Sequence, residues 1–287
     1  MKPATVATAA DLVDVPWIEV RHPDASLGHV RHALFDFDGT ISVIRRGWED
    51  VMIPMMVEMI GGGKPVDPEI QAEVADYVDR STGILTIKQM AWLAEAVARY
   101  GLNPDVRTAR AYKAIYNERL LKPVRARLRS AGEDGGVSES LTIAGAVDLL
   151  SGLRNRGVSL YLASGTDHKY VLQEAAALGV ARFFEGEIYG AMDDTEAYTK
   201  KRIIQRILDD HDLRGSELLV VGDGPVEIRE AARRGALTLG VAADEARREG
   251  LDARKRQRLI DAGADLIVTD FLHHEALVDW FVGAQRR

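Results

Sequence analysis

The chain has 287 residues, of which 46% are hydrophobic and 28% are charged; its formal net charge is −7 and it contains no cysteine. This composition is typical of a globular protein of about two domains, and it excludes disulfides, thiolate metal sites and a cysteine nucleophile. The acidic balance argues against a nucleic-acid-binding protein, which would present a basic face. The sequence shows neither a membrane-spanning stretch nor a signal-peptide pattern, so we expect a cytoplasmic protein with no nucleic-acid or membrane partner.

Short apolar runs alternate with longer amphipathic segments, which predicts parallel strands joined by helices. The runs are hydrophobic without interruption, as expected for strands covered on both faces. Strands are predicted at 32–37, 159–163, 217–221, 236–241 and 265–268, with an edge strand near 17–20. Helices are predicted at 142–156, 200–210 and 226–234. The pattern therefore predicts an α/β fold.

Residues 46–139 interrupt this alternation and predict helices without a buried strand. Asp67 followed by Pro68 is a typical helix start, and further helices are predicted at 87–100 and 103–130. We expect Pro123 to kink or divide the last of these, and residues 132–136 to form a flexible linker. The expected domains are a core of residues 1–45 and 140–287 and an inserted helical domain of residues 46–139.

The segment Asp36-Phe37-Asp38-Gly39-Thr40 follows the first predicted strand directly. In a parallel sheet, ligands bind at the carboxyl ends of the strands, so two carboxylates there can act at one site. An acidic turn without function is the simplest alternative. A calcium loop of the EF-hand type fits poorly because it would need an acidic residue or Asn in place of Thr40 and a glycine directly after it, and the oxygen-only donors make a zinc site a poorer fit.

Three further elements follow in order. Ser164-Gly165-Thr166 ends the second strand, where a hydroxyl and backbone amides can hold a phosphoryl oxygen. Lys200 begins an amphipathic helix, and Asp223 and Glu227 lie four residues apart at a strand-to-helix turn, a pattern that favours a hard cation. Each element alone has an ordinary structural explanation: a plain turn, a solvated lysine or a helix start.

Together, these four elements resemble the haloacid dehalogenase superfamily over residues 30–45 and 140–287. The resemblance implies a Rossmann-like three-layer sandwich with a mainly parallel sheet, in which residues 46–139 form a helical cap of the C1 type. Glu227 stands where the family often has aspartate, so it is expected to reach the metal through water. The phosphate-binding lysine is Lys200 by its register in the helix, with Lys201 as the alternative.

The resemblance also implies a mechanism. Asp36 attacks phosphorus and forms an aspartyl-phosphate, and Asp38 acts as the general acid and base. Ser164, the Gly165 amide and Lys200 neutralise the phosphoryl oxygens. The implied cofactor is Mg²⁺, with Asp36, Asp38 through its backbone carbonyl, Asp223 and Glu227 as its ligands or their support. The expected substrate-binding residues are Thr40, Gly165, Thr166, Arg45 and Arg46, with Ser81-Thr82-Gly83 as a candidate specificity loop.

The resulting hypothesis is a magnesium-dependent phosphatase for a small phosphorylated metabolite, a sugar phosphate or polyol phosphate. The alternatives are a phosphomutase of the same fold, a phosphonate hydrolase and a non-catalytic module that binds a phosphometabolite. The phosphonate hydrolase would need a cap lysine such as Lys64 or Lys88. The sequence does not distinguish a monomer from a homodimer.

Overall fold

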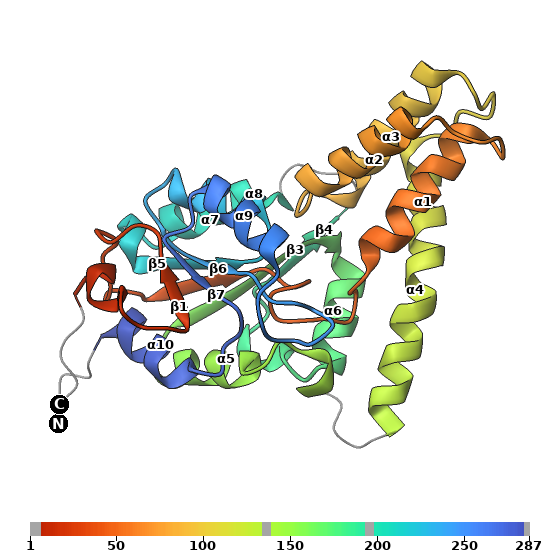
Figure 1. Cartoon of the computed structure of the whole chain (residues 1–287). Coiled ribbons are helices and arrows are strands. Elements are labelled where there is room, and N and C mark those ends of the chain that lie inside the picture. Colours follow the sequence, from red (N-terminus) through yellow and green to blue (C-terminus); the bar gives the residue numbers. More distant parts are fainter. Residues whose placement is uncertain (1–6, 134–138, 193–197, 284–287) are drawn as a thin grey trace.

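The computed structural model, which describes residues 7–133, 139–192 and 198–283, contains one seven-stranded sheet between two layers of helices, and a helical insertion (Figure 1). The strands are β1 (Ile18–Val20), β2 (His32–Phe35), β3 (Ser159–Asp167), β4 (Ile188–Ala191), β5 (Leu218–Gly222), β6 (Leu237–Val241) and β7 (Leu266–Val268). Their order is β1-β7-β6-β5-β2-β3-β4. Only β1 pairs antiparallel among these strands. The predicted α/β fold with a mainly parallel sheet is confirmed.

Helices cover both faces of the sheet because successive residues of each strand point to opposite sides. Ala33 and Phe35 of β2 pack on the face covered by α5 (Ala146–Asn155), α6 (His168–Ala177) and α10 (His274–Val282). Leu34 packs on the other face, which is covered by α7 (Lys200–Asp210), α8 (Pro225–Ala232) and α9 (Ala253–Ala262). The short 3₁₀ helices are η1 (Ala9–Leu12), η2 (Glu139–Leu141), η3 (Ala181–Phe183) and η5 (Gly215–Glu217).

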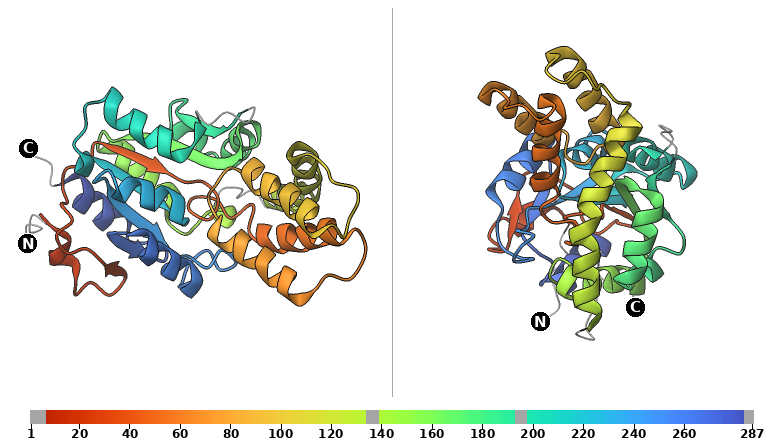
Figure 2. Two further views of the ribbon diagram at one scale, coloured as in Figure 1. Left: turned by 90° about the horizontal axis from the view of Figure 1, so that it is seen from above. Right: turned by 90° about the vertical axis from the view of Figure 1, so that its right-hand side faces the viewer.

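The insertion lies between β2 and β3. It consists of α1 (Trp48–Gly61), α2 (Pro68–Arg80), α3 (Thr86–Tyr100) and α4 (Ala109–Glu133). The two further views show these orange-to-yellow helices projecting beyond one end of the sheet (Figure 2). Asp67 caps α2 as predicted, since its Oδ1 accepts a hydrogen bond of 2.9 Å from Glu69 N. Because β2 leads straight into this insertion, its helices lie at the carboxyl ends of the strands.

Two sheet features differ from the prediction. β4 was not predicted, because its four residues include Gly190 and form too short an apolar run. β3 extends to Asp167, four residues beyond the predicted end, because Asp167 pairs with Ala191 of β4 across an irregularity in the register. The other strands differ from the predicted bounds by at most two residues, and the edge strand β1 is present.

Three predictions about the helices are wrong in detail. The helix predicted at 142–156 begins at Ala146, because Thr142 and Ile143 pair with the loop after β2 instead. The helix expected from residue 103 begins at Ala109, because Asn103 Oδ1 accepts a hydrogen bond from Asp105 N in a turn. Pro123 does not divide α4, which continues to Glu133 and so occupies the start of the predicted linker. Residues 134–136 of that linker lie outside the described residues.

The described part of the chain, residues 7–133, 139–192 and 198–283, has no helix that is both long and apolar enough to span a bilayer.

Candidate active site

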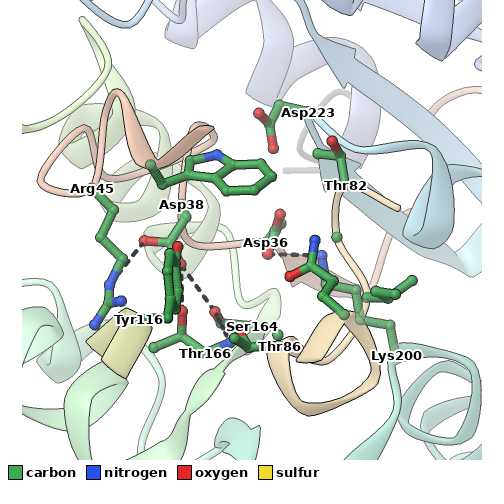
Figure 3. A pocket seen from close by; sticks show the side chains of 15 residues that line it. Asp36, Asp38, Arg45, Thr82, Thr86, Tyr116, Ser164, Thr166, Lys200 and Asp223 are labelled. Carbon is green, nitrogen blue, oxygen red and sulfur yellow. Dashed lines mark hydrogen bonds and ion pairs between the residues drawn. The ribbon is translucent and has the colours of Figure 1, made fainter. Parts of the chain in front are cut away.

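The predicted motif residues meet at the carboxyl edge of the sheet. Asp36 follows β2, Ser164 lies in β3, Asp223 follows β5, and Lys200 begins α7. The side chains converge around one cavity (Figure 3). The backbone N–H of Asp36 still donates to Val221 O of β5, which fixes the direction in which the motif leaves the sheet.

Lys200 links two acids of the site. Its buried ammonium lies 2.9 Å from Asp36 Oδ1 and 2.8 Å from Glu227 Oε2. Burial alone would lower the pKa of Lys200, but these two carboxylates raise it above its ordinary value. Lys201, one residue later on α7, is exposed. The sequence offered Lys200 and Lys201 as candidates for the phosphate-binding lysine. The fold places Lys200 against Asp36.

Asp38 is held apart from this ion pair. Its Oδ2 accepts hydrogen bonds of 3.1 Å from the hydroxyls of Ser164 and Thr166, and its Oδ1 is buried without a hydrogen-bond partner. Burial raises the pKa of Asp38, although the nearby Arg45 and the two hydroxyls act in the opposite direction. A carboxyl in this setting is favoured in its protonated form.

Arg45 lies beside Asp38, with its Nε 3.8 Å from Asp38 Oδ1. Its guanidinium also donates to both oxygens of Glu174 on α6, at 3.0 and 2.7 Å. Both side chains are buried. This bidentate pair fixes the guanidinium at the edge of the cavity.

Two of the expected substrate-binding residues are elsewhere. Arg46 is not among the described residues that line the cavity, whereas its neighbour Arg45 lines it and pairs with Glu174. Thr40 is fully buried, and its hydroxyl lies 3.5 Å from Asp223 Oδ1 rather than at the cavity. Gly165 and Thr166 line the cavity.

A buried group of carboxylates offers a site for a cation. Asp36, Asp223 and Glu227 each contribute an oxygen, and these oxygens all lie within 4.8 Å of one another. Burial, together with Glu227 and Asp223, raises the pKa of Asp36 well above its ordinary value, against the effect of Lys200. Such crowding of hard oxygen donors fits Mg²⁺, which would relieve the repulsion.

The carboxylates are not equivalent as ligands. Glu227 accepts hydrogen bonds from Gly224 N and from Lys200, each at 2.8 Å, so both of its oxygens are engaged. The side chain of Asp38 is not part of this carboxylate group, so Asp38 would contact a cation there through its backbone carbonyl. Asp36 meets Lys200 through Oδ1, and Asp223 Oδ1 has only a long contact of 3.5 Å with the Thr40 hydroxyl, so these two side chains are better placed than Glu227 to ligate a metal directly.

The cavity lies between the core and the insertion and has a volume of about 80 Å³. From the core it is lined by Asp36, Asp38, Ser164, Gly165, Thr166, Lys200, Asp223 and Arg45. From the insertion it is lined by Trp48, Thr82, Gly83, Ile84, Thr86, Gln89 and Tyr116. Thr82 and Gly83 of the predicted specificity loop thus reach the site.

The sequence did not predict three charged residues near the site: Glu174 and Lys255, which are buried, and Glu245, which is partly buried. Lys255 lies in α9, and its ammonium is 2.8 Å from Asp223 Oδ2 and 2.6 Å from Glu245 Oε1. Gly39, with φ +77°, makes room for this arrangement, since a Cβ there would lie 2.2 Å from Asp223 Oδ2. These residues follow no recognisable motif, although three cations at the start of α9 are an unusual pattern.

Comparison with known proteins supports the assignment made from the motifs. A family model for haloacid dehalogenase-like hydrolases matches residues 30–235. A 5'-nucleotidase of Pseudomonas aeruginosa is 26% identical over 218 residues, which cover 76% of this chain and 85% of the relative.

Solved structures share the fold. A predicted phosphatase from Clostridium acetobutylicum has a TM-score of 0.55 at 16% identity, covering 88% of this chain and 100% of its own. A predicted phosphoglycolate phosphatase from Haemophilus somnus has a TM-score of 0.55 at 15% identity, covering 87% and 98%. With the family model matching most of its length, the chain belongs to the haloacid dehalogenase-like hydrolase family.

Proposed function

We propose that this hydrolase is a magnesium-dependent phosphatase that cleaves a small phosphate monoester through an aspartyl-phosphate on Asp36. The observation that carries the proposal is the position of Lys200. Its ammonium holds Asp36 Oδ1 at 2.9 Å beside a small cavity that Ser164 and Gly165 also line. A carboxylate and a fixed ammonium at one end of such a cavity suit a nucleophile and a binding site for a phosphoryl group.

In the first step, a carboxylate oxygen of Asp36 attacks phosphorus and the bond from phosphorus to the ester oxygen breaks. Asp38 gives its proton to the departing alkoxide. The raised pKa of Asp38 supports this role, because burial favours the form that carries the proton. Lys200 and the backbone of Gly165 neutralise the phosphoryl oxygens.

In the second step, water attacks phosphorus and the bond from phosphorus to Asp36 breaks, which releases inorganic phosphate. Asp38, now ionised, takes the proton of the attacking water and returns to its starting state. The hydrogen bonds from Ser164 and Thr166 to Asp38 Oδ2 hold the carboxyl in one orientation during both steps.

Asp36 and Asp223 are the proposed metal ligands, with the Asp38 backbone carbonyl and waters. Glu227 supports the site by holding Lys200. When bound, Mg²⁺ supplies positive charge that keeps Asp36 ionised and stabilises the charge on the phosphoryl oxygens.

We further propose that the insertion, residues 46–139, is a cap of the C1 type that selects the substrate. We propose a sugar or polyol phosphate as the substrate; because the cavity of about 80 Å³ holds little more than a phosphoryl group, the cap has to open for the alcohol portion. The relative from P. aeruginosa is named a 5'-nucleotidase, so nucleoside 5'-monophosphates are the main comparison. A nucleoside would need the cap to open more widely.

The test is phosphate release from a panel of sugar phosphates, polyol phosphates and nucleoside 5'-monophosphates, scored by kcat/KM with and without Mg²⁺. We expect release that depends on Mg²⁺ and is highest for a small ester. Asp36→Asn should abolish turnover while its circular dichroism spectrum stays that of the wild type. Near-normal turnover by Asp36→Asn would show that the nucleophile is wrongly assigned.

The same panel separates the alternatives. A phosphomutase would move phosphate between two positions of a sugar phosphate without net release. A phosphonate hydrolase would be trapped by borohydride with a carbonyl phosphonate, but the only lysine among the described residues lining the cavity is Lys200. A binding module would bind a phosphate ester and turn over none of them.

A further inference from the structure

Lys255 is a second buried lysine at the site, for which the proposed mechanism has no role. Its side chain is about as buried as that of Lys200, and its ammonium bridges Asp223 Oδ2 and Glu245 Oε1 at 2.8 and 2.6 Å. The two acids come from different loops, one after β5 and one after β6. The lysine therefore joins the proposed metal ligand Asp223 to an acid outside the group of metal-binding carboxylates.

The position of Lys255 in its helix does not stabilise the helix. The buried location of its ammonium is therefore explained by its two carboxylate partners. Lys255 lies in the first turn of α9, where the helix dipole disfavours a cation. Its neighbours Arg254 and Arg256 are also basic, but they pair with partly exposed acids, Asp79 and Glu19. Only Lys255 of these three is buried. Asp252 caps the helix and holds the Lys255 backbone N–H at 3.0 Å.

Without the lysine, the buried Asp223 and the partly buried Glu245 would form a second pair of carboxylates that shares Asp223 with the first group. Burial, and also the charge of Asp223, raises the pKa of Glu245, while Lys255 opposes both effects. Two carboxylates whose oxygens approach a common point are suitable ligands for a divalent cation. The ammonium of Lys255 lies at that common point.

We propose that Lys255 is the fixed cation that limits this centre to one divalent ion. Its ammonium lies between Asp223 and Glu245, where a second ion would otherwise bind, and it holds Asp223 Oδ2 at 2.8 Å. Lys255 is a positioning residue, since it acts through Asp223. The inference rests on the proposed role of Asp223 as a metal ligand.

The test counts bound Mn²⁺ by calorimetry and by electron paramagnetic resonance at pH 8. The wild type should bind one ion, with the spectrum of an isolated centre. Lys255→Gln, which removes the charge but keeps a hydrogen-bond donor, should bind one ion more than the wild type and give the signal of a spin-coupled pair. Lys255→Gln/Glu245→Gln should lose the extra ion, because the second carboxylate is gone. Lys255→Arg should behave as the wild type.

Two results would overturn the proposal: a coupled pair of Mn²⁺ ions in the wild type, or no gain in Lys255→Gln. The wild-type spectrum decides the first even if Lys255→Gln does not fold. Lys201→Gln, a substitution of an exposed lysine, is the matched control and should change nothing. The number of bound Mn²⁺ ions is measured without any turnover of substrate. A wild type that binds one ion but hydrolyses no ester contradicts the proposed function alone, whereas an active enzyme with a coupled pair contradicts this inference alone.

Discussion

Gly165 of the core and Ile84 of the insertion meet backbone to backbone, so closely that a Cβ on Gly165 would lie 2.5 Å from the Ile84 carbonyl oxygen. Gly165 lies in β3 and Ile84 follows the candidate specificity loop of residues 81–83, and both line the cavity. The absence of a side chain on Gly165 therefore lets the insertion approach the proposed phosphate-binding residues this closely.

Gly165→Ala should push the insertion away from the core, because neither backbone can yield. We expect kcat/KM to fall by about 100-fold, since a displacement of about 1 Å of groups that position the substrate has that effect. Steady-state kinetics with the best ester of the panel measure the loss. Gly157→Ala is the control: it adds strain at φ +80° far from the cavity, with open space around its Cβ. It should lower stability and leave kcat/KM unchanged; an equal loss in both variants would contradict the prediction.

Lys200→Met and Lys201→Met form a matched pair on one helix. The first removes the ammonium that contacts Asp36 and Glu227 and should lower kcat by about 10²- to 10³-fold. The second removes an exposed charge and should change kcat by less than about twofold. Single-turnover kinetics with a labelled phosphate ester would compare the two. A larger effect of Lys201→Met would show that the wrong lysine has been assigned to the phosphoryl group.

The buried pair of Arg45 and Glu174 should show strong coupling. Arg45→Met or Glu174→Leu alone leaves an unpaired buried charge and should lower the free energy of unfolding by about 3–5 kcal/mol. The double variant should lose much less than the sum, which urea denaturation can measure. Arg119 and Glu58, a more exposed bidentate pair between α4 and α1, serve as the comparison. Their coupling should be about 1 kcal/mol or less. Additive losses at Arg45 and Glu174 would mean that the pair does not form.

His32 should make stability depend on pH. Its ring is buried at the amino end of β2, with Nδ1 3.1 Å from the Tyr161 hydroxyl. Burial, followed by the charge of the neighbouring His211, lowers the pKa of His32 to about 4 from 6.5. The unfolded chain takes up this proton near pH 6.5 and the folded chain only near pH 4. The free energy of unfolding therefore falls as the pH drops through this window and is fully present above it.

The comparison of wild type with His32→Gln in urea at pH 7 and pH 5 isolates this effect. Between these values the wild type should lose about 1–2 kcal/mol more than the variant. His29→Gln, which replaces an exposed histidine of the same segment, is the control and should lose as much as the wild type. Parallel losses in wild type and His32→Gln would show that His32 is protonated equally in both states.

The sequence by itself determined the strands that carry the motifs, the insertion between β2 and β3, and the meeting of Asp36, Ser164 and Asp223. Continuous apolar runs predict buried parallel strands, and the carboxyl ends of such strands share one edge of the sheet. The sequence did not predict β4, because a short strand with a glycine has no local signal that distinguishes it from a loop.

Only the tertiary structure decided which of two adjacent basic residues belongs to the site. Lys200 and Lys201 differ by about 100° around their helix, and packing of α7 against the sheet turns one inward and the other outward. The tertiary structure also distinguishes Arg45 from Arg46, because it is Arg45 that pairs with Glu174. Lys255 and Glu245 follow no motif, because long-range packing brings them together: α9 carries Lys255 to Asp223, and the loop after β6 carries Glu245 to Lys255. The local sequence pattern indicates which edge of the sheet carries the candidate site. Which charged side chains pair with each other depends on contacts between segments that are distant in the sequence.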